Sequence, residues 1–203
     1  IVNGVERVII NQLVRSPGVF FSAADDPITG KRLYSAEIRP YRGSWLEFSI
    51  SRSGVLTAKI DRRRKFAVTT LLRAIGFSDT EAIKELFKDV DLGEEKLIDA
   101  TLAKDPTTTQ DEALLEIFRK MRPGDPVVLD NAKALLEGMF FNGRRYNLTK
   151  VGRFKINKKL GLDVANNEEN WILTQSDIIE TLKYLIKLTN GVGKVDDIDH
   201  LAN

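Results

Sequence analysis

The spacing of hydrophobic and polar positions in this chain changes near residue 65. Before that point, short runs of β-branched and aromatic residues are separated by turns rich in Gly, Ser, Pro and Asp, which is typical of strands. Because consecutive runs are joined by short turns, the first third of the chain is predicted to form an antiparallel β-meander. The predicted strands cover residues 5–14, 18–22, 33–39, 45–51 and 55–61.

Beyond residue 65 the apolar positions recur about every 3.6 residues, which predicts helices. The first of them runs from Phe66 to Gly76, and Ser78-Asp79-Thr80-Glu81 forms a strong N-terminal cap for the next, which continues through Phe87. Thr174 to Asp177 cap a long amphipathic helix that stops at Asn190-Gly191. Further helices are predicted over 94–103, 110–121, 129–139 and 148–160, with a loosely structured loop at 161–171. The predicted fold class is therefore α+β, with the meander first and a mostly helical remainder.

Composition limits the class of protein. The chain has 203 residues, of which 42% are hydrophobic and 30% charged, so it can bury a core and is too hydrophobic to be disordered. The absence of Cys excludes disulfides, thiolate metal sites and cysteine nucleophiles, and it fits a reducing, cytoplasmic location. No apolar run approaches the roughly 20 residues that cross a bilayer. The chain begins with Ile instead of Met, which predicts a piece of a longer protein.

The charges are segregated along the chain although the net charge is only +2. Cations gather at residues 59–65 and 144–159, whereas acids gather at 79–116 and 163–180. This segregation predicts a basic side on the surface, suited to an anionic partner. Two other interpretations stay open: solvated faces of the fold, and pairing between the cations and the acids of the same chain.

Aromatic residues accompany the first basic run. Trp45 follows Pro40-Tyr41-Arg42-Gly43-Ser44, and Asp61 to Lys65 come after the next predicted strand. Arginine and lysine neutralise phosphates while an unstacked base can lie on an indole ring, so this combination is suited to an unpaired nucleic acid strand. The alternative is that Trp45 is an ordinary core or edge aromatic of the sheet.

The motifs that could carry catalysis are weak. Gly138 to Arg145 have the glycine spacing of a phosphate loop but lack its Lys-Ser/Thr pair, and a hydrolase triad would have to use His200, the only histidine. Asp197 and Asp199 could bind Mg²⁺ in an autonomous nucleotidyl transferase, but acids this close in sequence mostly point apart. We therefore predict no catalytic residue and no metal site in this chain.

Several blocks of sequence together resemble the β subunit of bacterial DNA-directed RNA polymerase, and they follow one another in the order of that family. The blocks are Glu6–Val19, Pro40–Trp45, Ile60–Lys65, Met121–Gly124, Arg145–Tyr146, Val151–Arg153 and Val195–Leu201. The β subunit is much longer, so the resemblance implies a fragment that covers its lobe, the second N-terminal domain. In this interpretation residues 1–7 are an edge of the protrusion domain, residues 8–195 form the lobe, and residues 196–203 return towards the protrusion.

The resemblance also implies a function. In the family, the lobe is a wall of the DNA cleft that contacts the downstream duplex and the non-template strand during transcription, and it is not catalytic alone. The catalytic Mg²⁺ is bound by the partner β′ subunit, so no cofactor is expected here. The implied partners are DNA, the β′, α and sigma subunits, and transcription regulators, at the nucleoid. The alternative class is a protein-interaction module that docks a transcription regulator.

Carried over residue by residue, the resemblance implies a pocket for a flipped guanine of the non-template strand. Asp199 would accept hydrogen bonds from the guanine edge, and Trp45 would stack on the neighbouring base. The implied pocket residues are Arg15, Trp45, Asp61, Arg62, Ile198 and Asp199. Arg7, Ile10 and Gln12 match one edge of the family's rifamycin pocket. From the basic runs, the predicted contacts to the DNA backbone are Arg63, Arg64, Lys65, Arg144, Arg145, Arg153, Lys155 and Lys158.

Overall fold

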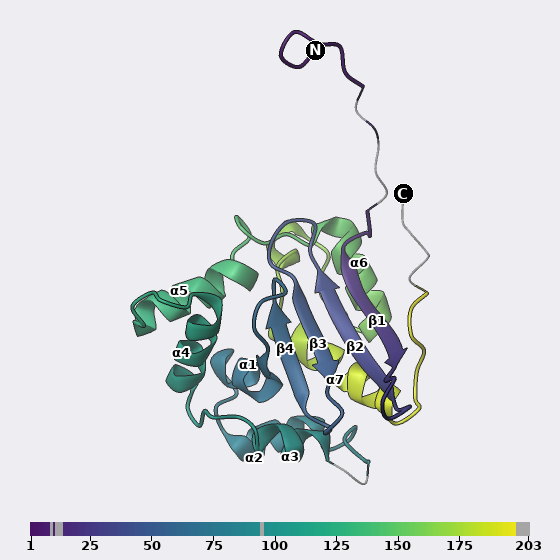
Figure 1. The fold of residues 1–203 in the computed structure, drawn as a ribbon, viewed down its shortest axis with the longest axis vertical. Helices are drawn as coiled ribbons and strands as arrows, with labels where there is room; N and C mark the ends of the chain where they lie inside the picture. The colour runs from purple at the N-terminus through teal and green to yellow at the C-terminus, as the bar shows by residue number, and fades with distance from the viewer. Residues whose placement is uncertain (9, 11–13, 94–95, 198–203) are drawn as a thin grey trace.

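A five-stranded antiparallel sheet packed against helices makes up the folded body (Figure 1). The computed structural model describes residues 1–8, 10, 14–93 and 96–197. The strands are β1 (Gly18–Asp25), β2 (Arg32–Arg39), β3 (Leu46–Ile50), β4 (Leu56–Ile60) and β5 (Phe66–Ala67), and each pairs with the next along the chain. The predicted meander is therefore confirmed, and its one unpredicted strand is the two-residue β5.

The helices follow the sheet in sequence, as the 3.6-residue period indicated. They are α1 (Val68–Ala74), α2 (Thr80–Phe87), α3 (Leu97–Leu102), α4 (Gln110–Met121), α5 (Leu129–Phe140), α6 (Thr149–Leu160) and α7 (Gln175–Thr189), with a 3-10 turn, η1 (Glu168–Asn170). Asp79 caps α2, and Thr174 forms a reciprocal capping box with Asp177 at the start of α7, as predicted. The α+β class is confirmed.

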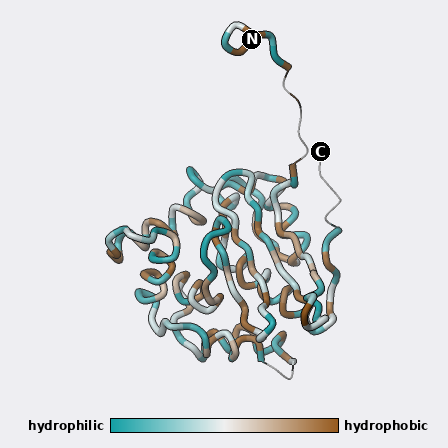
Figure 2. The backbone as a smooth tube through the Cα atoms, in the orientation of Figure 1, coloured by the Kyte–Doolittle hydropathy of each residue, from teal (hydrophilic) through white to brown (hydrophobic). Residues whose placement is uncertain are grey.

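The two faces of the sheet differ in their surroundings. Buried and partly buried residues alternate along β3 and β4, because successive side chains of a strand point to opposite faces. Figure 2 colours the chain by hydropathy, and hydrophobic and more polar positions follow one another along these strands. The apolar face packs on helices: α6 lies against β1, α7 against β2, and α1 and α3 against β4. The opposite face, here called the open face, carries polar side chains. They are Ser35, Glu37 and Arg39 of β2, Glu47 and Ser49 of β3, and Thr57 and Lys59 of β4.

Two predictions about irregular segments need correction. The described residues between 5 and 14 are not in a strand, because Val8, Ile10 and Val14 are exposed and no neighbouring strand pairs with them. The segment 161–171 was predicted to be loosely structured, but it contains η1 and is tied to its surroundings. The Asn166 side chain donates to the Lys150 carbonyl over 2.9 Å, and the Asn157 side chain donates to the carbonyl of Val164 over 2.6 Å. Within the segment, the Trp171 indole N–H donates to Asn166 Oδ1 over 2.8 Å.

Candidate nucleic-acid interface

Two hydrogen bonds join the backbone of Trp45 to Asp61 in the turn after β4. The Trp45 N–H donates to Asp61 Oδ1 over 2.8 Å, and the Asp61 N–H donates to the Trp45 carbonyl over 3.0 Å. Asp61 and Arg62 both have left-handed backbone angles, with φ of 48° and 57°, so the chain turns sharply there. The structure thus brings together Trp45, Asp61 and Arg62, three members of the implied guanine pocket.

Arginine side chains surround the Trp45 indole. The guanidinium carbon of Arg39 lies 4.3 Å from the ring centroid and that of Arg62 lies 5.1 Å from it. Glu37 links this group to Arg15, since its two carboxylate oxygens lie 2.7 Å from Arg39 Nε and 3.2 Å from Arg15 Nη1. Arg15, a fourth predicted pocket residue, is therefore connected to Trp45 through two intervening side chains.

The last two residues assigned to the guanine pocket, Ile198 and Asp199, lie outside the described residues. The chain that leads to them is anchored at the edge of β1. Asp196 accepts a hydrogen bond from the Phe21 N–H over 2.7 Å, donates its own N–H to the Phe21 carbonyl over 2.8 Å, and lies 2.5 Å from Lys159 Nζ. The Asp196 carboxylate is therefore already bound by the Phe21 N–H and by Lys159.

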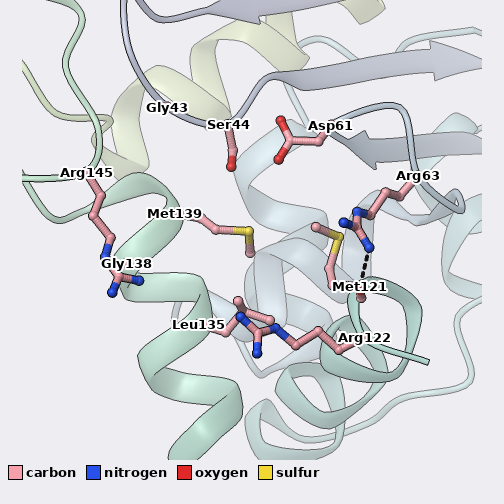
Figure 3. A pocket seen from close by; sticks show the side chains of 10 residues that line it. All are labelled: Gly43, Ser44, Asp61, Arg63, Met121, Arg122, Leu135, Gly138, Met139 and Arg145. Atoms are coloured by element: carbon pink, nitrogen blue, oxygen red, sulfur yellow. Dashed lines mark hydrogen bonds between the residues drawn. The ribbon is translucent and has the colours of Figure 1, made fainter. Parts of the chain in front are cut away.

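A hollow of about 390 Å³ is bordered by Ser44, which precedes Trp45, and by Asp61, which accepts the Trp45 N–H; we call it the arginine hollow (Figure 3). It is lined by Gly43, Ser44, Asp61, Arg63, Met121, Arg122, Leu135, Gly138, Met139 and Arg145. Three guanidinium groups converge on it from different elements: Arg63 from the turn after β4, Arg122 from the end of α4, and Arg145 from the loop after α5. Arg63 is fixed there, because its Nη1 donates to the Met121 carbonyl over 2.7 Å.

The predicted DNA-backbone residues are placed differently from one another. Arg63 and Arg145 line the arginine hollow. Arg64, Lys65, Arg144 and Lys158 are exposed and do not line it. Lys155 is half-buried, and its ammonium group donates to the Ser16 hydroxyl. Of the predicted set, Arg63 and Arg145 are therefore the two that share a hollow with Asp61, the hydrogen-bond partner of Trp45.

Arg153 is a correction to the prediction. Its side chain is 0% exposed and forms a bidentate pair with Asp177, with nitrogen–oxygen distances of 2.6 and 2.9 Å. Its remaining donors reach the carbonyls of Asn170 and Ile172 over 2.8 and 2.5 Å. Every contact therefore lies inside the protein, and Arg153 is no longer a candidate for contact with DNA.

Two of the three residues that match the rifamycin pocket are described by the structure. Arg7 and Ile10 are exposed, and Gln12 lies outside the described residues. Within the part of the chain that the structure describes, no group of three or more His, Asp or Glu side chains is placed to hold a metal ion. None of the described helices is both long and apolar enough to span a bilayer.

Three functional candidates were missed from the sequence. Arg122 faces the arginine hollow, and its block Met121–Gly124 had been noted only for its resemblance. On the open face, Arg39 contacts the Trp45 ring, and Glu37 contacts both Arg39 and Arg15. Strand alternation could have placed Glu37 and Arg39 on one face, but which face of the sheet the helices cover cannot be read from the strands alone.

Comparison with known proteins shows the family of this chain. The family model "RNA polymerase Rpb2, domain 2" matches residues 15–203. The chain is 46% identical to the DNA-directed RNA polymerase subunit beta of Streptomyces coelicolor over 215 residues, and 46% identical to that of Streptomyces avermitilis. These alignments cover 100% of this chain and 18% of each relative, so the chain spans under a fifth of their length. The chain therefore belongs to the RNA polymerase Rpb2, domain 2 family.

Proposed function

We propose that this chain is a part of the β subunit of a DNA-directed RNA polymerase, in which it forms a wall of the DNA cleft and contacts the downstream duplex and the non-template strand. The relatives carry that name, and the chain aligns with them over its whole length. The observation that carries the proposal is the link between Trp45 and the arginine hollow: the Trp45 N–H donates to Asp61, which lines the hollow together with three arginines suited to phosphates.

The chemistry of this site fits a single strand. A guanidinium presents paired N–H donors that match a phosphate, and it keeps its charge at all physiological pH values. Arg63, Arg122 and Arg145 could neutralise consecutive phosphates while a splayed base stacks on Trp45. A duplex hides its bases, so the same arginines would hold a duplex only through its backbone.

The role proposed for the chain is to hold DNA, and nucleotide addition is assigned to the rest of the nucleotidyltransferase. The Mg²⁺ of catalysis would be bound by the β′ subunit, and this chain would contribute no cofactor. Its partners in the assembly would be DNA, the β′, α and sigma subunits and transcription regulators, in the cytoplasm at the nucleoid.

We expect Trp45→Ala to weaken binding of a single-stranded arm about 5- to 150-fold, which corresponds to the roughly 1 to 3 kcal/mol of one stacked base. The measurement is fluorescence anisotropy of the 203-residue chain with forked DNA whose arm carries either guanine or adenine, at two salt concentrations. Asp199→Ala is expected to abolish a preference for guanine and to leave adenine binding unchanged. The matched control is Trp171→Phe, since Trp171 lies in the 161–171 segment and outside the arginine hollow. Equal affinity of Trp45→Ala and the wild type would refute the stacking role.

Arg122→Ala and Arg145→Ala test the arginine hollow separately. Each is expected to weaken the guanine and adenine arms equally and to lower the slope of log affinity against log salt by about 0.7, because one phosphate contact to a single strand is lost. Arg119→Ala is the matched control: Arg119 lies on the same helix as Met121, is 60% exposed and does not line the hollow. If all three variants lost the same affinity, the effect would come from net charge and not from the hollow.

A docking surface for a transcription regulator is the second candidate function, and one observation favours it. Val151 and Phe154 are 51% and 58% exposed on α6, one helical turn apart, where an apolar patch suits a protein partner. Phe154→Ala should leave DNA affinity unchanged if α6 serves proteins only. A loss of DNA affinity in this variant would place α6 in the nucleic-acid interface instead.

A further inference from the structure

The Trp45 indole is contacted by arginines that come from both sides of its strand. Arg39 ends β2, and Arg62 follows β4, the strands that flank β3 on either side. Their guanidinium carbons lie 4.3 and 5.1 Å from the indole centroid, within the range of a cation–π attraction. They come to the ring from the two strands that flank β3.

The two arginines are held very differently. Arg39 is 19% exposed, and its Nε lies 2.7 Å from a Glu37 carboxylate oxygen. Glu37 is itself 18% exposed and is contacted on its other oxygen by Arg15 over 3.2 Å. Arg62 is 68% exposed, and its nearest carboxylate oxygen, on Glu47, lies 3.5 Å away. The ring is therefore contacted by one arginine that is held in place and by one that is loosely held.

We infer that Arg39 is a positioning residue for the base platform, which rests on the proposed function of Trp45. Asp61 fixes the backbone of Trp45, and Arg39 fixes the orientation of its ring, so the platform is already ordered before a strand arrives. The side of the indole under Arg62 is the one that an unstacked base occupies. Arg62 leaves the ring as the base stacks, and its guanidinium becomes available to the nucleotide.

Arg39 could instead be one more phosphate contact, but its surroundings argue against that role. Its guanidinium lies between the Glu37 carboxylate and the indole. Glu37 offsets its charge and would repel a phosphate placed beside it. The two roles make different predictions: a phosphate contact contributes to the salt dependence of binding, whereas a positioning residue acts only through Trp45.

The test uses the 203-residue chain with Trp171→Phe, which leaves Trp45 as the only tryptophan. Binding of the forked DNA is followed by anisotropy and by the quenching of Trp45 fluorescence. We expect Arg39→Ala to weaken binding about three- to tenfold, the equivalent of a partly desolvated cation–π contact. The salt slope should stay unchanged, and acrylamide should quench Trp45 more strongly in the free variant. Arg39→Lys should restore part of the affinity.

The controls separate positioning from general effects. Arg32→Ala removes the same charge from an exposed position of the same strand and is expected to bind like the wild type. In a Trp45→Ala background, Arg39→Ala should cause no further loss. Glu37→Gln weakens the ion pair that holds Arg39 without replacing Arg39 itself. It is expected to give a smaller loss of DNA affinity, again with an unchanged salt slope. It also serves as the test variant if Arg39→Ala does not fold, as judged by circular dichroism.

The outcomes are distinct. An Arg39→Ala loss that persists without Trp45 and lowers the salt slope would make Arg39 a phosphate contact and overturn the inference. Wild-type affinity in both Arg39→Ala and Glu37→Gln would overturn it as well. In either case a strong effect of Trp45→Ala would leave the proposed function intact. If Trp45→Ala itself binds like the wild type, the stacking role in the proposed function fails, and the inference fails with it.

Discussion

Replacement of Arg153 by Ala is expected to lower the free energy of unfolding by about 3 to 5 kcal/mol, the usual consequence of breaking a buried ion pair. Arg153 and Asp177 are both 0% exposed and join α6 to α7 through two short contacts. Without the guanidinium, the Asp177 carboxylate would lie uncompensated in the interior. The carbonyls of Asn170 and Ile172 would also lose their donors. The segment before α7 should therefore loosen together with the helix pair.

Urea unfolding followed by far-UV circular dichroism measures this loss. Lys158→Ala is the matched control, because Lys158 is a cation on the same helix but exposed, and its change is expected to stay within about 0.5 kcal/mol. A double variant, Arg153→Met with Asp177→Asn, should recover part of the stability, since it removes both charges and keeps an oxygen for the Thr174 cap. An Arg153→Ala variant as stable as Lys158→Ala would show that the pair contributes little.

Arg153 also shows where a sequence pattern loses its power. The strands and helices depend on local periodicity and on caps such as Thr174, and apart from the strand predicted over 5–14 the structure has an element at each predicted place. A basic run, by contrast, shows only which residue types are present, and it does not show whether each side chain points to solvent or to the interior. Cations occur on several sides of α6, the helix that holds Arg153. Arg153 points inward because it pairs there with Asp177, which lies 24 positions later in the chain. Nothing local to residues 144–159 distinguishes that arginine from its neighbours.

The candidate site was predictable to a similar, limited degree. Trp45, Asp61 and Arg62 came from a motif and a resemblance, and the structure brings them together across two strands. The arginine hollow could not be predicted, because its walls come from parts of the chain as far apart as Gly43 and Arg145, which meet only after α4 packs on α1 and α5 packs on α4. Arg122 is exposed and in a loop, so no hydrophobic pattern marks it. The segment 5–14 failed for the opposite reason: its β-branched residues favour a strand, but its described residues have no strand beside them.

Gly43 connects the site to the core, and Gly43→Ala is expected to lower the free energy of unfolding by about 2 to 4 kcal/mol. Its φ of +129° strains any residue with a Cβ. An added Cβ would lie 2.7 Å from Tyr146 Cδ2 and 3.1 Å from Tyr146 Cα. Tyr146 cannot withdraw easily, because it is 1% exposed and packs edge-on against Phe140. The neighbouring backbone is also fixed, since Asn147 exchanges hydrogen bonds with Arg42.

The same substitution should weaken DNA binding even in molecules that stay folded. Gly43 lines the arginine hollow, and its Cβ would also come within 3.2 Å of the Arg145 carbonyl, so relief of the clash moves Arg145. Gly124→Ala is the matched control for strain alone: its φ is +100°, and nothing lies within 4 Å of an added Cβ. Urea unfolding and anisotropy on both variants separate the two effects. If Gly124→Ala loses as much stability as Gly43→Ala, backbone strain alone accounts for the loss. If Gly43→Ala loses more stability and also binds DNA more weakly, the close packing of Gly43 on Tyr146 sets the shape of the hollow.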